Sequence, residues 1–336
     1  MKDLVIGDLH FGIKTNNISW LTQQLQFIDD CVMPNIDGHQ RVIFLGDLFD
    51  IRYSINTQVG CEVKKKVRKM VKQYPTVEFF FIAGNHDYFS PIVDFEEYNA
   101  YEVVFGEEFV DIYKNLHIVS TVPYLDNRTL MLPWYFTEDD TRYVATTKEY
   151  RGQYDIIYCH TDCEHWSADK TALKGDAAVY SGHIHYPYVN KEAKLYNVGA
   201  ACSFTFNDAN SERYIYTIED GVIVKSYENT VTPRFKRYYN ERIFTLTAAD
   251  LNNSYTQLCI SADNINKANY IEQIKQLKST YINCNISTVV IDNNMQGPVC
   301  SGVDLNTDIH GYIKNNIPGY LSEKYEMLKK RIQNAD

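Results

Sequence analysis

Residues 41–50 read RVIFLGDLFD, an apolar run that stops at a glycine and is followed by two carboxylates. Residues 2–10 (KDLVIGDLH) and residues 77–87 (VEFFFIAGNHD) follow the same plan. Short apolar runs separated by segments with helical spacing predict buried strands that alternate with helices. This alternation is typical of a largely parallel sheet with helices on its faces. Strands are expected at Asp3–Gly7, Arg41–Leu45 and Val77–Ile82, and helices at Ser19–Met33 and Val59–Tyr74.

The pattern changes after residue 87, where the apolar runs become shorter and the gaps between them wider. A second sheet packed against the first is the simplest account, so the predicted fold class is α/β, a four-layer α/β/β/α sandwich. Further helices are expected at Asp94–Phe105 and Thr137–Tyr150. Strands are expected at His117–Ser120, Thr129–Leu132, Asp155–Cys159 and Ala177–Ser181, and antiparallel strands at Leu195–Val198, Tyr214–Ile218 and Val222–Tyr227.

The basic and aromatic segment Arg234–Tyr239 is the expected hinge between two domains. We predict a first domain at residues 1–235 and a small α+β capping domain at residues 236–293. Residues 294–336 are expected to form a turn-rich linker and a helical tail. The expected elements after the hinge are the strand Gln257–Ser261, the helix Asn269–Tyr281, the strand Ser287–Asp292 and the tail helices Asp304–Asn316 and Leu321–Ile332.

The composition is that of an ordinary globular protein, with 45% hydrophobic and 23% charged residues in a chain of 336. No apolar run reaches the roughly 20 residues needed to cross a bilayer. The first strand begins at once and leaves no room for a signal peptide. We therefore expect no membrane association, a cytoplasmic location (host cytoplasm if the gene belongs to a phage) and eight reduced cysteines.

The net charge of −10 argues against broad, non-specific binding to nucleic acid. It does not exclude an enzyme that acts on nucleic acid, because bound divalent cations would add local positive charge. The basic segment Lys64–Lys69 is interpreted as a solvated helix face rather than a DNA contact.

Five polar motifs follow predicted strands, and they contain the carboxylate, imidazole and amide groups that divalent cations bind. In such sheets, sites form outside the carboxyl ends of the strands. We therefore expect two cations roughly 3.5–4 Å apart, with Asp47 bridging them through its two oxygens. The motifs are Gly7-Asp8-Leu9-His10, Gly46-Asp47-Leu48-Phe49-Asp50, Gly84-Asn85-His86-Asp87, Cys159-His160-Thr161-Asp162 and Gly182-His183-Ile184-His185, and the predicted ligands are Asp8, His10, Asp47, Asn85, His160, His183 and His185.

His86 is adjacent to a predicted ligand but is not needed as one, so it is the candidate general acid for the leaving group. Asp50 or Asp87 could orient it. A single Gly-Asp dipeptide is usually a turn, and a single buried histidine is usually a core residue. Five such motifs, each after a predicted strand, favour a metal site instead.

In this order the motifs resemble those of the calcineurin-like metallophosphoesterase superfamily, over roughly the first 230 residues. Within it, the segments at residues 7–12 (GDLHFG) and 196–204 (YNVGAACSF) are similar to those of double-strand-break repair nucleases of the SbcD type. The compact length resembles the small nuclease subunit of the recombination endonuclease of T-even phages.

This resemblance implies two divalent cations, with Mn²⁺ favoured and Mg²⁺ as the alternative. It implies one cation on Asp8, His10, Asp47 and His185, a second on Asp47, Asn85, His160 and His183, and His86 as the catalytic histidine.

The implied activity is DNA exonuclease or endonuclease cleavage of phosphodiester bonds, in a complex for recombination or double-strand-break repair. The implied partners are the DNA substrate and an SMC-like ABC ATPase, with the chain as a homodimer within a heterotetramer. The tail stripe Ile309, Ile313 and Ile317 is the candidate ATPase contact, or these helices pack on their own domain.

Two other activities remain open. The first is a phosphatase or another phosphodiesterase of the same superfamily. Protein phosphatases of this group carry Arg-Gly after the second motif and Glu after Asn-His, where this chain has Ile51-Arg52 and Asp87. The second is a non-catalytic scaffold, although scaffolds lose ligands or the general acid and this chain keeps all of them.

Overall fold

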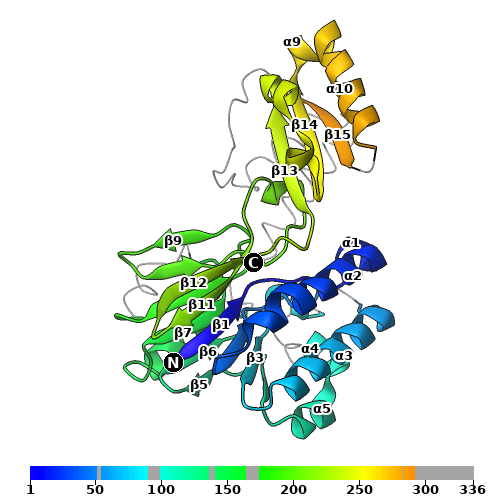
Figure 1. Cartoon of the computed structure of the whole chain (residues 1–336). Helices are drawn as coiled ribbons and strands as arrows, with labels where there is room; N and C mark the ends of the chain where they lie inside the picture. The colour runs from blue at the N-terminus through cyan, green and yellow to red at the C-terminus, as the bar shows by residue number, and fades with distance from the viewer. Residues whose placement is uncertain (51–53, 90–98, 136–140, 164–173, 283, 292–336) are drawn as a thin grey trace, which may run out of the picture. The chain divides into compact units, whose positions relative to one another are not determined.

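The first sheet of the computed structural model is built on the parallel strands that the opening motifs predict (Figure 1). The structure describes residues 1–50, 54–89, 99–135, 141–163, 174–282 and 284–291. Strand β1 lies in the middle of this sheet, parallel to β2 and antiparallel to β11. The order of the six strands is β12 (Val222–Glu228), β11 (Tyr214–Glu219), β1 (Lys2–Ile6), β2 (Arg41–Phe44), β3 (Glu78–Ile82) and β4 (Leu116–Val119).

A second six-stranded sheet faces the first, and it differs in two respects from the prediction. Strands β11 and β12 belong to the first sheet, where the edge of β1 pairs with β11. Strand β10 was expected to be antiparallel, but it runs parallel to β8 and antiparallel only to β9. The order is β5 (Tyr124–Asp126), β6 (Thr129–Leu132), β7 (Ile156–His160), β8 (Ala178–Gly182), β10 (Leu195–Asn197) and β9 (Tyr188–Asn190).

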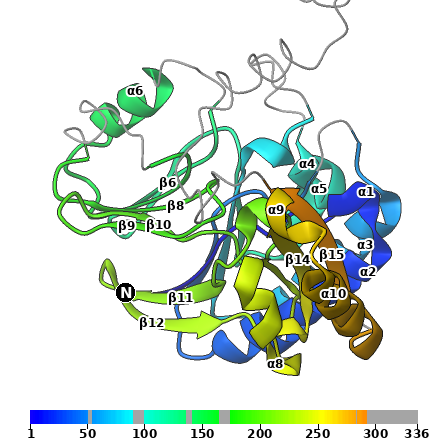
Figure 2. The same cartoon turned by 90° about the horizontal axis from the view of Figure 1, so that it is seen from above.

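Helices cover the outer faces of both sheets, which confirms the four-layer sandwich (Figure 2). One apolar cluster, with Ile43, Phe80 and Tyr158, fills the space between the sheets. A larger cluster lies between the first sheet and its helices, and a third, with Tyr143, lies between the second sheet and α6. The helices are α1 (Ile13–Asn16), α2 (Ile18–Phe27), α3 (Thr57–Gln73), α4 (Ala100–Val104), α5 (Gly106–Ile112) and α6 (Thr141–Glu149).

Helices α2, α3 and α4 each begin after an asparagine whose side chain accepts from the first backbone N–H groups. Asn56 caps α3 by accepting hydrogen bonds from Gln58 N at 2.8 Å and Val59 N at 3.3 Å. The helix predicted at Ser19–Met33 is interrupted, because α2 passes at residue 28 into a π-helical turn (Ile28–Val32) and then a 3₁₀ turn (Met33–Asn35). Two further predicted helices correspond to α4, which begins at Ala100, and α6, which begins at Thr141, and the predicted first residues 94–98 and 137–140 lie outside the described residues.

A small three-stranded sheet follows, and the predicted hinge at Arg234–Tyr239 is wrong because this segment is the strand β13. Its backbone pairs in parallel register with β14, from Arg234–Ser254 to Tyr239–Cys259. Helix α10 covers an apolar cluster that includes Leu258, Tyr270 and Leu277. The elements are β13, the turn η6 (Asn240–Thr245), α8 (Ala248–Leu251), β14 (Ser254–Ser261), α9 (Ala262–Ile265), α10 (Ala268–Thr280) and β15 (Asn285–Ile291).

The predicted division at residues 235 and 236 therefore falls within a strand. Met1–Val290 forms one compact unit. The predicted linker and tail helices at residues 294–336 lie outside the described residues. Within the described part of the chain, no helix has the length and apolarity needed to cross a bilayer.

Candidate metal centre

The polar motifs meet at the carboxyl ends of the parallel strands. Strand β1 leads to Asp8 and His10, and β2 leads to Asp47. Strand β3 leads to the 3₁₀ turn Asn85–Asp87, and β7 ends at His160. Parallel strands bring their carboxyl ends to one edge, so motifs far apart in sequence converge there.

The first group of side chains consists of Asp8, His10 and His185. Nε2 of His10 lies 3.1 Å from Nε2 of His185, and the latter lies 3.8 Å from Oδ2 of Asp8. The backbone N–H of His183 lies 3.2 Å from both carboxylate oxygens of Asp8. Asp8 and His10 are buried, so water hardly reaches these polar groups.

The second group consists of Asn85, His160 and His183. Oδ1 of Asn85 lies 3.1 Å from Nε2 of His160 and 2.9 Å from Nδ1 of His183. His160 is fully buried, and its ring lies edge-on to that of His183. An amide oxygen and two imidazole nitrogens are thus brought together from three strands.

Asp47 lies between the two groups. Its Oδ2 is 3.6 Å from Nε2 of His10 and 3.3 Å from Nε2 of His160. Its Oδ1 accepts a hydrogen bond from the backbone N–H of His86 at 2.8 Å. The prediction that both oxygens bridge two cations stays a prediction. The turn after β3 places an N–H on Oδ1, and Oδ2 faces the histidines of both groups.

The backbone at the centre is strained. His10, Asp47 and His183 have φ values of 49°, 46° and 84°, in the left-handed region that residues with a side chain rarely adopt. Such strain persists only where the surrounding structure fixes it, and it is common at functional sites. A Cβ at Gly84 would collide with the carboxylate and the backbone N of Asp47. The glycine lets the third motif approach the second.

The hydrogen bonds of the histidines test whether cations fit. Nδ1 of His160 donates to the carbonyl oxygen of Leu45 at 2.7 Å, which directs Nε2 toward Asp47 and Asn85. The facing Nε2 atoms of His10 and His185 cannot both be acceptors without a proton or a cation nearby. Burial lowers the pKa of His10 to about 3, so that imidazole is neutral and can be a ligand.

The pKa shifts of Asp8 and His160 also indicate that cations fit the centre. Burial raises the pKa of Asp8 to about 6, with Asp47 adding to the effect and His160 opposing it. Burial acts to lower the pKa of His160, but Asp47 outweighs it and raises that pKa to about 9. The centre therefore attracts positive charge between Asp47 and His160. The donor set fits two divalent cations that share Asp47, and their binding would release a proton.

His86 lies beside the first group, and its ligand atoms form a third close cluster with those of His10 and Asp50. Its Nδ1 lies 2.8 Å from Oδ1 of Asp50, and its ring is edge-on to that of His10 with centroids 4.8 Å apart. Asp87 does not contact His86 in this way, because its oxygens accept from the backbone N–H groups of Phe49 and Gly84 at 2.8 Å. Of the two predicted orienting residues, Asp50 occupies that place and Asp87 supports the turn.

Three residues of the centre escaped the sequence analysis. Asp208 lies 3.2 Å from Nδ1 of His185 and was hidden in a segment with no metal-binding motif. Its signal was the Thr-x-x-Asp pattern of a capping box at residues 205–208. Phe204 lies edge-on to His10 and His185, with ring centroids 4.9 and 5.4 Å away. The ring of Trp134 is tilted by 32° to that of His183, with centroids 4.7 Å apart.

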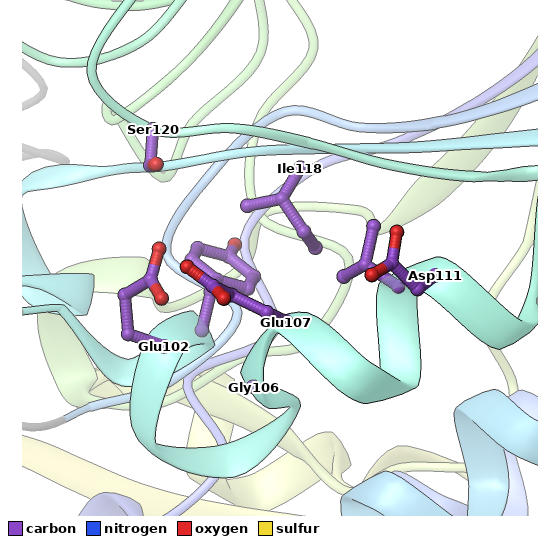
Figure 3. A pocket seen from close by; sticks show the side chains of 8 residues that line it. Glu102, Gly106, Glu107, Asp111, Ile118 and Ser120 are labelled. Atoms are coloured by element: carbon purple, nitrogen blue, oxygen red, sulfur yellow. The ribbon is translucent and has the colours of Figure 1, made fainter.

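A separate pocket of about 320 Å³ lies between α4, α5 and β4 (Figure 3). Glu102, Glu107 and Asp111 line it, so its charge is unsuited to a phosphate. None of the predicted ligands lines it. It touches the centre only through Tyr101, whose hydroxyl donates to Asp87 at 3.2 Å. We assign it no role.

The basic residues of α3 have partners within the protein. Nζ of Lys64 donates to the carbonyl oxygen of Phe105 at 3.0 Å, and Lys66 and Lys69 both pair with Asp29. The guanidinium of Arg68 lies 5.5 Å from the ring centroid of Phe109. These contacts agree with the interpretation of this segment as a helix face rather than a DNA contact.

The similarity of this chain to known proteins lies in the part of the sequence that supplies the metal centre. A family model described as "Calcineurin-like phosphoesterase" matches residues 1–187, which contain all five polar motifs. The search of curated proteins gave no match. Among solved structures, the chain is similar to "Crystal structure of Pseudomonas putida nuclease MPE" at 14% identity, over 66% of this chain and 86% of that chain, with a TM-score of 0.30. A likeness this low says nothing about activity.

Proposed function

The chain belongs to the calcineurin-like phosphoesterase family, and from this premise we propose that it is a Mn²⁺-dependent DNA nuclease. The family is one of metal-dependent phosphoester hydrolases, and the groups described above are candidate cation sites. The observation that carries the proposal is that Oδ2 of Asp47 faces both groups, at 3.6 and 3.3 Å from their histidines. One carboxylate shared by two ligand sets is the arrangement that a pair of neighbouring cations requires.

The proposal of DNA as substrate rests on the two segments that resemble repair nucleases. In the structure, residues 196–204 wrap around the first group of ligands. Ala200 N donates to the carbonyl oxygen of His185 at 3.1 Å, and Ala201 N donates to that of Asp8 at 3.1 Å. Phe204 packs against the ligands, as described above. A segment that was singled out by its resemblance alone thus borders the metal centre.

The protein's own groups have separate tasks in the proposed reaction. When bound, two divalent cations supply Lewis-acid stabilisation of the charge that develops on the phosphate. His86 presents Nε2 on the side away from Asp50 and donates a proton to the leaving oxygen. Asp50 holds that orientation through Nδ1, at 2.8 Å. A proton donor of this kind contributes about 10²–10⁴-fold in rate.

The test compares substrates with and without a second ester bond. Purified protein with Mn²⁺ is given linear duplex DNA, single-stranded DNA, bis-p-nitrophenyl phosphate and p-nitrophenyl phosphate. We expect cleavage of DNA and of the diester, and loss of both in Asp47→Ala together with most bound metal. Cleavage of the diester without DNA degradation, even with the ATPase supplied, would instead support another phosphodiesterase of the family. Preference for the monoester would support a phosphatase, and inactivity despite bound metal would support a scaffold.

We further propose that the chain works with an SMC-like ATPase, as a homodimer within a heterotetramer, in the cytoplasm. The support is the sequence resemblance and the apolar stripe predicted at Ile309, Ile313 and Ile317. Co-purification of the two subunits, followed by measurement of the mass of the complex, tests both the partner and the stoichiometry. A monomer that does not bind an ATPase encoded beside it would contradict this assignment.

A further inference from the structure

His185 contacts a buried carboxylate on the side of its ring that faces away from the other ligands. Its Nε2 points to His10 and Asp8, while its Nδ1 lies 3.2 Å from Oδ1 of Asp208. We propose that Asp208 is a positioning residue, which holds His185 as the Nδ1–H tautomer so that Nε2 is free to bind a divalent cation. This inference rests on the proposed metal-dependent function and extends it to the affinity of the cation site that contains His185.

Asp208 can do this because its own position is fixed independently of His185. Its Oδ2 accepts hydrogen bonds from Phe204 N at 2.8 Å and Thr205 N at 2.9 Å, as the last residue of a capping box. Those two bonds occupy Oδ2 and leave Oδ1 directed at the imidazole. The side chain is about 6% exposed, so water hardly competes for the free oxygen.

Arg213 supplies the opposite charge to this buried carboxylate. It is 1% exposed, and its guanidinium lies 3.7 Å from Oδ1 of Asp208 and donates to the carbonyl oxygen of the same residue at 3.2 Å. The same guanidinium donates to the carbonyl oxygen of His185 and, through Nε, to Ser203 Oγ at 3.1 Å. One arginine therefore holds both the carboxylate and the main chain of the histidine that it orients.

The backbone on either side of His185 is held as well. Nδ2 of Asn197 donates to the carbonyl oxygens of Ile184 at 2.7 Å and Tyr186 at 2.6 Å. With the main chain fixed at three consecutive residues, the remaining freedom of His185 is rotation of its ring and the choice of tautomer. The contact with Asp208 restricts both.

The buried histidine of the second group, His160, has a different partner on its Nδ1. That nitrogen donates to the backbone carbonyl of Leu45 at 2.7 Å, a neutral acceptor, and Oδ1 of Asp8 lies 3.9 Å from it, beyond hydrogen-bond distance. A carboxylate partner makes a metal-bound imidazole a stronger donor than a neutral carbonyl does, and removal of such a partner typically costs 10–100-fold in metal affinity. Asp208 is therefore expected to act on the site of His185 and not on that of His160.

The experiment is Mn²⁺ titration of Asp208→Asn, followed through the paramagnetic resonance of the free ion. The amide would keep the size of the side chain but present an N–H₂ group or a weaker acceptor to Nδ1 of His185. We expect the wild type to bind two ions, and the variant to bind one normally and the other about 10–100-fold more weakly. A folded variant that binds both ions like the wild type would overturn the proposal.

Asp250→Asn is the matched control. Asp250 closes a capping box of the same pattern, accepting from Thr247 N at 2.9 Å, and it also pairs with an arginine, Arg242, at 3.3 Å. Within the described part of the small domain, its side chain contacts Thr247 and Arg242 and no histidine. Loss of a cap and of an arginine partner is thus common to both variants, and a metal effect in both would count against a specific role for Asp208.

A measurement on the wild type covers the case in which Asp208→Asn does not fold. Long-range proton–nitrogen correlation spectra of metal-free protein at pH 8.5, assigned with His185→Gln, report which ring nitrogen carries the proton. We expect Nδ1–H at His185, and Nε2–H would overturn the proposal. Two bound ions without DNA cleavage would defeat the nuclease proposal and leave this one standing. DNA cleavage with unchanged metal binding in Asp208→Asn would do the reverse.

Discussion

His86 illustrates how one hydrogen bond separates a proton donor from a metal ligand. Its Nδ1 faces Asp50 at 2.8 Å, so the nitrogen available to a substrate is Nε2. The residue before it, Asn85, contacts both histidines of the second group. Neighbouring residues of one turn therefore serve different tasks, because the 3₁₀ turn Asn85–Asp87 directs their side chains apart.

We predict that His86→Ala lowers the rate of diester cleavage by about 10²–10⁴-fold while both metal ions remain bound. The physical reason is that His86 belongs to neither ligand group and acts only on the leaving oxygen. Rates with bis-p-nitrophenyl phosphate and metal content by elemental analysis check this. Asp50→Asn is the companion variant, with a smaller loss of rate and the same metal content. Loss of metal in His86→Ala would show that the histidine is a ligand.

At this scale the sequence predicted which residues meet but not the atoms that they use. Asp8, His10 and Asp47 follow apolar runs in the sequence, which predicted that they meet at one site. The reason is that the carboxyl ends of parallel strands lie at the same edge of a sheet. It could not show that Oδ1 of Asp47 is taken by a backbone N–H, because that depends on the turn of another motif. Asp208 was missed because a residue that only supports a ligand needs no motif of its own.

Among the elements, the turn between β3 and the third motif leaves no room for an added side chain. Gly84 has an ordinary backbone conformation, with φ of −97°, so its requirement is for space alone. We predict that Gly84→Ala destabilises the fold by about 1–3 kcal/mol, as overpacking does, and abolishes cleavage. The reason is that the new Cβ would displace Asp47, whose carboxylate lies against it. Urea unfolding and diester cleavage measure the two effects.

Gly60→Ala is the control for that variant. Gly60 lies within α3, and the nearest atom to an added Cβ is the side-chain Cγ2 of Val104 at 3.3 Å, which can move. A helical Gly→Ala exchange changes stability by about 1 kcal/mol or less and leaves the centre untouched. If Gly84→Ala kept full activity, the close approach of the two motifs would not be needed for the site.

At the amino ends of the strands, a buried ion pair ties the two sheets together. Arg41, the first residue of β2, donates to both oxygens of Asp3 in β1, at 2.8 and 2.7 Å. Tyr158 of β7 donates to the same carboxylate at 2.8 Å, and Arg41 also donates to Thr129 of β6 at 3.0 Å. Arg41 is 2% exposed and Asp3 1% exposed.

We predict that Arg41→Met destabilises the protein by about 3–5 kcal/mol, because it leaves the carboxylate of Asp3 buried without its partner. The activity per folded molecule should not change, since the pair lies at the opposite ends of the strands from the metal centre. The exposed pair Arg128–Asp155 is the control, because its geometry is similarly bidentate, at 2.5 and 2.7 Å. Arg128→Met should have a far smaller effect in the same urea titration. Equal losses of stability in Arg41→Met and Arg128→Met would contradict the prediction that the burial of the Arg41–Asp3 pair causes the larger effect.

The elements that sequence spacing predicted best are the buried strands, because their apolar runs end at glycine or polar residues. It failed at Arg234–Tyr239 (RFKRYY), where the mixture of basic and aromatic residues predicts a hinge. In the structure Phe235 is buried and stacks against Tyr255, while the three basic residues of the strand are partly exposed. A partly solvated strand that pairs with a later segment has no strong local signal.

In the whole molecule, the chemistry is confined to the first part of the chain. All predicted ligands, His86 and the supporting Asp208 and Arg213 precede residue 214. The sequence alone is enough to predict that the metal centre is built from the first part of the chain, because each motif is a short local pattern. It could not show that β11 and β12 join the first sheet or that β10 runs parallel to β8, since pairing between distant strands is decided by the packing of the complete core.

This division predicts the result of trimming the chain to residues 1–296. The shortened protein should fold, bind two Mn²⁺ ions and cleave bis-p-nitrophenyl phosphate within about twofold of the full rate, because Met1–Val290 forms a compact unit that contains the centre. Its co-purification with the ATPase should be weakened, since the predicted contact, the tail helices Asp304–Asn316 and Leu321–Ile332 with the stripe Ile309, Ile313 and Ile317, is removed.

Point variants of the full chain separate the loss of a contact from the loss of a folded tail. Ile313→Glu places a charge in the predicted apolar stripe and should reduce co-purification with the ATPase without changing diester cleavage. Asn315→Glu adds the same charge outside the stripe and should leave both unchanged. If the trimmed protein still bound the ATPase, the docking surface would have to lie within residues 1–296. If Ile313→Glu lowered the thermal stability of the full chain instead, the tail helices would pack on their own domain. The reason is that a charge buried on the packed face of a helix destabilises the domain to which that helix belongs.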